Sequence, residues 1–103
     1  MEGHSVISAG VLGRYAADAA GEVAGVQGLV NGSRSRQRGV RVSEEDGSLA
    51  VELHLAVAWG ADVPALGESV QRHVHEYLGR MSGLPVTRVD VVVDEVAAPA
   101  SAA

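Results

Sequence analysis

The chain has 103 residues, of which 47% are hydrophobic and 20% are charged. That balance predicts one compact domain and excludes a charged, disordered chain. Cysteine and lysine are both absent, which excludes disulfide scaffolds, thiolate metal sites and Schiff-base lysines. The net charge of −5 disfavours a domain that binds nucleic acid or anionic membranes with its whole surface.

No apolar run approaches the roughly 20 residues of a membrane span. The N-terminal residues also lack the charged and apolar regions of a signal peptide. We therefore expect a cytoplasmic protein without a direct membrane span.

A first helix is predicted to begin after Ser8, a residue type favoured as an N-cap. Arg14, Asp18 and Glu22 recur every four residues and are expected to form an exposed charge row. Gly25 stands where a glycine would end the helix. Apolar residues recur on the other face at spacings of one, three and four; they are Val11, Leu12, Tyr15, Ala16, Ala19 and Val23.

Three strand segments follow. Val26–Val30 is a short candidate, and Val40–Val42 begins a second strand after a polar loop. Glu44–Gly47 carries an Asp-Gly turn signal, which predicts a hairpin between the second and third strands. The third strand alternates strictly, and one set of its side chains is expected to face a core: Leu49, Val51, Leu53, Leu55, Val57 and Trp59.

A second helix is predicted from an apolar stripe between Val63 and Met81, with Pro64 in its first turn and Gly83 at its end. Residues 86–96 alternate as a last strand. Residues 97–103 have no apolar anchor, and we expect them to be a disordered, Ala-rich tail.

The predicted element order is α-β-β-β-α-β within a single domain over residues 5–96. Each strand has one apolar face and each helix one apolar stripe. We therefore expect a two-layer α+β domain with one mixed four-stranded sheet and two helices on one face. The third strand, second helix and last strand would form a right-handed crossover, and those two strands should be parallel if they are adjacent.

His73 and His75 on the second helix suggest a metal site at first sight. Residues i and i+2 of a helix point roughly 200° apart, so the two side chains cannot share an ion. We expect His73 at the border of the apolar stripe and His75 in solvent. The sequence predicts neither a metal site nor a cofactor.

The outward face of the sheet is the first candidate interaction site. His54 follows Glu52 on the third strand, and the same face is expected to carry Arg41, Arg88, Asp90 and Asp94. Carboxylates near an imidazole also occur in general acid–base sites. Such chemistry needs a water-restricted pocket, which an open sheet face does not supply. We therefore interpret these residues as a solvated or partner-binding face.

The segment with Arg34, Arg36 and Arg38 holds the only concentrated positive charge. It could bind phosphate or an acidic partner, and it carries the alternative hypothesis of a nucleic-acid binder. The simpler interpretation is a mobile, solvated hairpin tip, because the loop has no apolar anchor.

Signals for catalysis are weak. No Gly-rich loop joins a strand to a helix in the phosphate-binding pattern, and no serine lies in a nucleophile-elbow context. A small enzyme would need polar groups in a pocket between helix and sheet, whereas the expected inward residues are apolar. We therefore predict that the protein is not an enzyme.

Several short segments in a fixed order resemble the alkaline-shock-protein family, also called envelope stress response proteins. The matching segments extend over about residues 5–96. They are Val6–Ser8, Val11–Leu12, Ala16, Ala19–Ala20, Glu22–Val26, Arg38–Val42, Val51–Val57, Trp59–Gly60, Val70–Gln71, Met81–Leu84, Val86 and Val89–Val93.

The resemblance implies a small, cytoplasmic, non-catalytic α+β protein connected with envelope stress in a Gram-positive bacterium. It also implies recruitment to the membrane by a small membrane anchor protein, and self-association into an oligomer. The family defines no catalytic residues, so none is assigned here. Our leading hypothesis is therefore a protein-interaction module with a scaffold role.

Overall fold

A computed structural model describes residues 7–30 and 39–97. The elements follow one another in the order α1, β1, β2, β3, α2 and β4, as the sequence predicts. The predicted arginine loop with Arg34, Arg36 and Arg38 lies outside the described residues, and so does the tail from residue 98 onward.

Helix α1 extends over Ala9–Gly21. Its N-cap is Ser8, as predicted, and the Ser8 hydroxyl accepts a hydrogen bond from the backbone N–H of Val11 at 3.2 Å. The prediction that the helix continues to Gly25 is wrong. Gly25 instead has φ +98° in the turn before β1, and an added Cβ there would lie 2.6 Å from Leu66 Cδ1. The turn therefore requires glycine for both its backbone conformation and its close packing on α2.

The central strand of the sheet is β3 (Ser48–Val57). One edge of β3 pairs antiparallel with β2 (Val40–Glu45) and, further along, with β1 (Val26–Leu29). Strands β1 and β2 lie one after the other along the same edge of β3. A line across the sheet therefore crosses only three strands at any point. The other edge pairs in parallel with β4 (Val86–Val96), which completes the four strands.

The hairpin between β2 and β3 turns at Asp46 and Gly47, whose φ values are +51° and +78°. Two successive positive φ values are typical of a type I′ turn, which suits the twist of paired strands. The Asp-Gly prediction is therefore confirmed.

Helix α2 (Val63–Ser82) connects β3 to β4. Asp62 is its N-cap and accepts a hydrogen bond from the backbone N–H of Ala65 at 3.2 Å. Pro64 occupies the first turn, and Gly83 ends the helix with φ +71°, as predicted. The cap and the glycine thus set both ends of the crossover.

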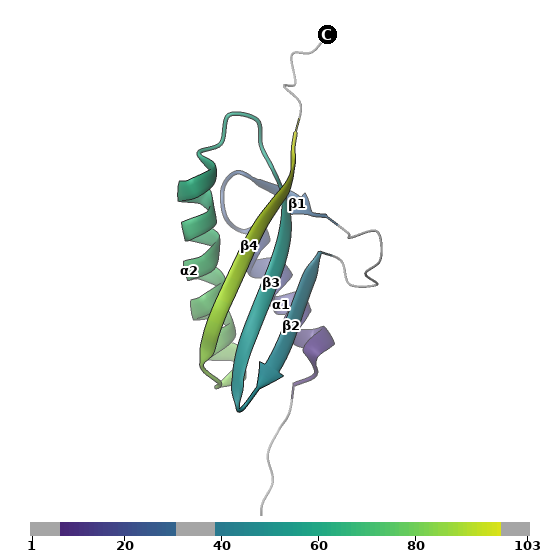
Figure 1. Cartoon of the computed structure of the whole chain (residues 1–103), viewed down its shortest axis with the longest axis vertical. Coiled ribbons are helices and arrows are strands. Elements are labelled where there is room, and N and C mark those ends of the chain that lie inside the picture. Colours follow the sequence, from purple (N-terminus) through teal and green to yellow (C-terminus); the bar gives the residue numbers. More distant parts are fainter. Residues whose placement is uncertain (1–6, 31–38, 98–103) are drawn as a thin grey trace, which may run out of the picture.

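Both helices cover the same face of the sheet, and the opposite face carries no helix in the described part of the chain (Figure 1). Leu53, Leu55, Val57, Val70 and Val74 are fully buried between the two layers. Among the described residues no polar or charged side chain is buried. The core is therefore a single apolar layer between helices and sheet.

Trp59 does not join this core, which corrects the expectation that it faces inward. Strand β3 ends at Val57, and the Trp59 side chain is 66% exposed. The backbone N–H of Ala58 donates to the Gly25 carbonyl, and Gly60 then turns the chain with φ +81°. The turn into α2 breaks the alternation before it reaches the tryptophan.

Candidate interaction surface

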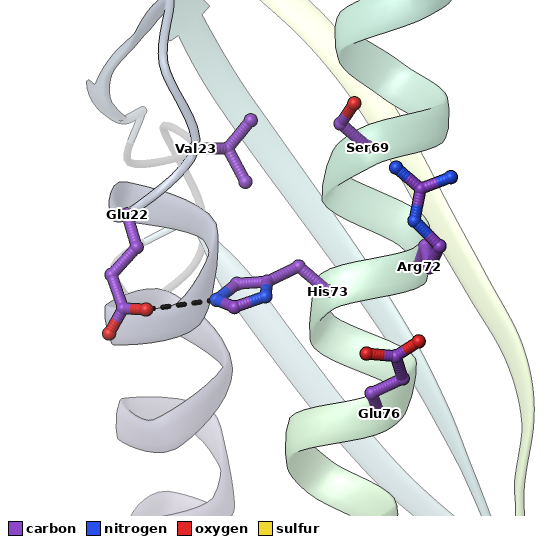
Figure 2. Close-up of a pocket in the computed structure, with 6 residues that line it drawn as sticks. All are labelled: Glu22, Val23, Ser69, Arg72, His73 and Glu76. Atoms are coloured by element: carbon purple, nitrogen blue, oxygen red, sulfur yellow. Dashed lines mark hydrogen bonds and ion pairs between the residues drawn. The ribbon is translucent and has the colours of Figure 1, made fainter.

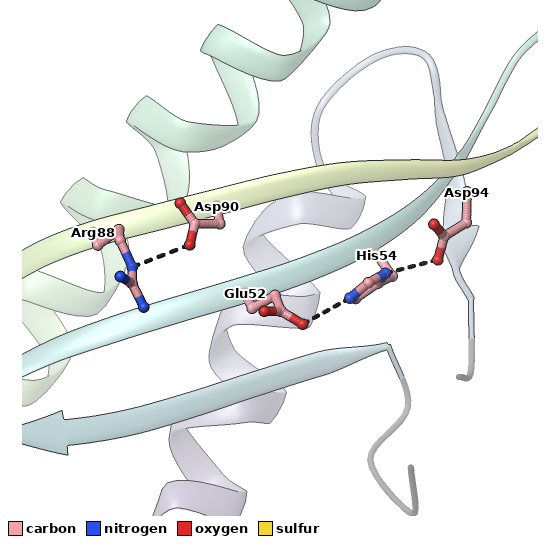
Figure 3. Close-up of polar contacts among 5 residues, drawn as sticks. All are labelled: Glu52, His54, Arg88, Asp90 and Asp94. Atoms are coloured by element: carbon pink, nitrogen blue, oxygen red, sulfur yellow. Dashed lines mark hydrogen bonds and ion pairs between the residues drawn. The ribbon is translucent and has the colours of Figure 1, made fainter. Parts of the chain in front are cut away.

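Charged and ionisable side chains gather on the uncovered face of the sheet, and six of them form the group that we call the outer sheet face. Neighbouring strands bring them together, since Arg41 of β2 is the register partner of Glu52 on β3, and Glu52 is the partner of Asp90 on β4. Strict alternation places these side chains opposite the apolar set that packs on the helices. The outer sheet face comprises Arg41, Glu52, His54, Arg88, Asp90 and Asp94. Figure 3 shows the five residues of β3 and β4.

His54 is held between two carboxylates. Its Nδ1 lies 2.7 Å from Asp94 Oδ2, and its Nε2 lies 2.8 Å from Glu52 Oε2. Both ring nitrogens can donate at once only when the imidazole is protonated. The hydrogen bond to Glu52, followed by that to Asp94, therefore raises the pKa of His54 above its ordinary value.

The same contact acts on Glu52. Its hydrogen bond to His54 lowers the pKa of the Glu52 carboxyl, and the charges of Arg41 and Arg88 lower it further. Arg88 also forms an ion pair with Asp90, with 3.0 Å between Nε and Oδ2. With His54 protonated, the six named side chains comprise three cations and three carboxylates. The register also places Glu45 and Glu95 on this side of the sheet.

These groups lie on an open surface. The side chains of His54, Glu52 and Asp94 are 32%, 45% and 38% exposed. Water therefore screens their charges and gives each ion pair a modest effect on stability. An open pattern of alternating charges is suited to selecting and orienting a protein partner.

Five of the predicted site residues therefore lie together, namely Arg41, Glu52, His54, Arg88 and Asp90. The three loop arginines, Arg34, Arg36 and Arg38, fall outside the described residues and stay a prediction. The alternation of the strands predicts the shared face, including Asp94. It does not predict which carboxylate contacts the imidazole, because that depends on the register of β4 against β3.

A second polar contact joins the two helices. Nε2 of His73 on α2 lies 2.9 Å from Oε2 of Glu22, at the C-terminal end of α1. Figure 2 shows this pair beside Ser69, Arg72 and Glu76, around a hollow of about 250 Å³. Glu22 thus contacts α2 instead of standing in the predicted row with Arg14 and Asp18, and no local spacing signals a contact across 51 positions.

The second histidine of α2, His75, is exposed, as its spacing from His73 predicts. Within residues 7–30 and 39–97, no three side chains of His, Cys, Asp or Glu are placed to hold a metal ion. Neither helix of the described structure is long and apolar enough to cross a membrane.

The model of the alkaline shock protein family, described as having a cell envelope-related function, matches residues 1–98. No curated protein sequence matches the chain significantly.

Solved structures similar to the chain include several of the MamM CTD. A double variant of that domain has a TM-score of 0.63 at 17% identity and covers 82% of this chain and 80% of its own. A single variant has a TM-score of 0.62 at 17% identity, with coverages of 82% and 89%. A manganese form has a TM-score of 0.55 at 14% identity, with coverages of 82% and 95%. At these identities the likeness shows a shared fold.

Proposed function

Because the chain belongs to the alkaline shock protein family, we propose that it is a non-catalytic protein-interaction domain that binds its partner through the outer sheet face. The family is described as having a cell envelope-related function, and we place the proposed role there. The observation that carries the proposal is the network of alternating charges around His54 on a sheet face that no described element covers.

The chemistry of this face favours recognition over catalysis. The imidazole and both of its carboxylates are partly exposed, so bulk water competes for every proton that His54 could transfer. Fixed alternating charges instead select a partner with the complementary pattern and set its orientation. Val92, 39% exposed between Asp90 and Asp94, adds an apolar contact at the middle of β4.

We place the protein in the cytoplasm of a Gram-positive bacterium, with recruitment to the membrane through a small membrane anchor protein. In this arrangement the domain is a scaffold component near the envelope, and its partner supplies the contact with the lipid bilayer.

The proposal is tested by His54→Ala and Arg41→Ala, each of which removes one charge of the outer sheet face. Both variants should weaken association with the partner, while the thermal midpoint changes little because both side chains are partly or fully exposed. Arg80→Ala, at an exposed position on α2, is the matched control. Partners are identified by crosslinking in native cells and mass spectrometry, and association is then measured with the purified partner. Unchanged association of both variants would remove the outer sheet face from consideration.

The alternative is a nucleic-acid binder that uses Arg34, Arg36 and Arg38. It requires binding that weakens as salt rises and that falls further when these arginines are replaced. RNA in place of a membrane protein among the crosslinked species would favour this alternative.

A further inference from the structure

Strand β4 presents an open edge. It pairs with β3 along one side, and no strand of the described structure pairs with its other side (Figure 1). The Gln71 side-chain amide donates to the Val89 carbonyl oxygen at 3.0 Å, so this carbonyl points away from β3. Backbone groups alternate along a strand, and Val91 and Val93 therefore also direct their N–H and C=O groups to the open edge. Such an edge can pair with another strand.

Space for a further strand exists beside this edge. A hollow of about 590 Å³ lies between α2 and β4, lined by Gln71, Arg72 and His75 on the helix side and by Val86–Asp90 on the strand side. Helix α2 therefore leaves the first half of the open edge accessible.

The sequence of β4 is complementary to itself in one antiparallel register. Val91 is the middle residue of Val86–Val96. The register against β3 shifts after Val86 and after Val93, so a two-fold axis at Val91 pairs the regular middle of the strand and brings its two ends opposite each other. This register places Arg88 opposite Asp94 twice, and it pairs the outward-bonding Val89 with the outward-bonding Val93.

Neighbouring registers lose this complementarity. An axis at Asp90 places two Asp90 carboxylates opposite each other, and an axis at Val92 places Asp90 opposite Asp94 twice. Like charges directly opposite each other on paired strands are destabilising. An axis at Val89 pairs Arg88 with Asp90 but leaves the C-terminal end of β4 unpaired.

We propose that two copies of this chain associate by antiparallel pairing of β4 with β4 around Val91, with Arg88 of each copy facing Asp94 of the second copy. The two sheets then form one continuous sheet, and the two outer sheet faces form one surface. This inference goes beyond the proposed function, because it assigns a contact between two copies through the backbone edge of β4, and it shares Arg88 and Asp94 with the outer sheet face.

A charge exchange tests the register. Arg88→Glu and Asp94→Arg should each weaken dimerisation at least about tenfold, and the double variant should restore it. Arg88 and Asp94 of one copy lie about 20 Å apart along the strand, and Arg88 pairs with Asp90 within its own copy. Restoration therefore cannot arise inside one molecule. Dimerisation is measured by sedimentation equilibrium of the full chain, and circular dichroism verifies that each variant is folded.

Crosslinking provides a second measurement, because the natural chain has no cysteine. Asp90→Cys combined with Val92→Cys should form an intermolecular disulfide, since these residues oppose each other in the proposed register. Val92→Cys alone should not, whereas it would crosslink in the register centred on Val92. The proposal would be overturned if the wild-type protein stayed monomeric at millimolar concentration. It would also be overturned if Arg88→Glu and Asp94→Arg left dimerisation unchanged, or if Val92→Cys alone formed the intermolecular disulfide. A monomer that still binds its partner through the outer sheet face would leave the proposed function intact.

Discussion

At the scale of single residues, the most informative group is His54 between Glu52 and Asp94. A neutral imidazole carries one N–H and can donate to only one of the two carboxylates. Protonation therefore completes the network, and deprotonation releases one carboxylate. The net charge of the outer sheet face therefore changes when His54 titrates.

The first prediction concerns Asp94→Asn. The variant should lower the pKa of His54 toward its ordinary value of 6.5, although Glu52 still holds it up. NMR titration of the imidazole protons measures this pKa. Asp18→Asn, on exposed α1 surface, is the control and should leave the His54 titration unchanged.

Asp94→Asn should also change how the stability of the fold depends on pH. The raised pKa of His54 stabilises the fold fully below pH 6.5, and this contribution disappears as pH rises through the raised value. The lowered pKa of Glu52 stabilises the fold above pH 4.5, and this is lost as pH falls through the lowered value. The stability deficit of Asp94→Asn should therefore shrink toward alkaline pH. A deficit that grew as pH rose would contradict this account.

At the scale of elements, α2 depends on packing more than on its surface charges. Leu78 and Val74 are fully buried beneath the helix, whereas Met81 in its last turn is 39% exposed. The Asp62 cap and Gly83 set the ends of α2, but the buried stripe holds it against the sheet. The crossover from β3 to β4, and with it the outer sheet face, therefore depends on this stripe.

The second prediction compares two side chains of α2. Leu78→Ala should lower the free energy of unfolding by about 2–5 kcal/mol, because it removes methyl groups and leaves a cavity. Met81→Ala, in the same helix, should cost well under half as much, because its side chain is partly in water. Urea denaturation followed by circular dichroism measures both values. Equal losses of unfolding free energy in the two variants would show that Leu78 is not part of the apolar core.

At the scale of the whole molecule, one core holds all elements together, since α1, α2 and every strand contribute to the same apolar cluster. The Tyr15 and Tyr77 rings meet across the two helices with centroids 6.1 Å apart and an interplanar angle of 68°. This edge-to-face contact exists only while the helices are docked.

The third prediction follows from this shared core. Thermal unfolding should be two-state, so the near-ultraviolet signal of the tyrosines and the far-ultraviolet signal of the helices should be lost in one transition. Trp59, the single tryptophan, is 66% exposed, so its emission should change little on unfolding. Separate transitions in the two spectral regions would show that the helices undock before the sheet unfolds.

Much of this architecture could be predicted from local features of the sequence. Strand alternation predicted the outer sheet face, Ser8 and Gly83 marked helix ends, and the Asp-Gly pair predicted the hairpin. These features depend on chemistry within a few residues, which a sequence displays directly. Local periodicity failed at Trp59, where the turn into α2 ends the strand.

Other features depend on how distant segments meet. The contact of His54 with Asp94 spans 40 positions and that of His73 with Glu22 spans 51. The sharing of one β3 edge by β1 and β2, and the early end of α1, follow from the docking of helices on the sheet. Pattern along the chain thus establishes which residues face outward. Which side chains contact one another is decided by strand register and helix docking. Many segments of the chain carry the same apolar pattern, so only the packing of all of them in one core determines which strands and helices are neighbours.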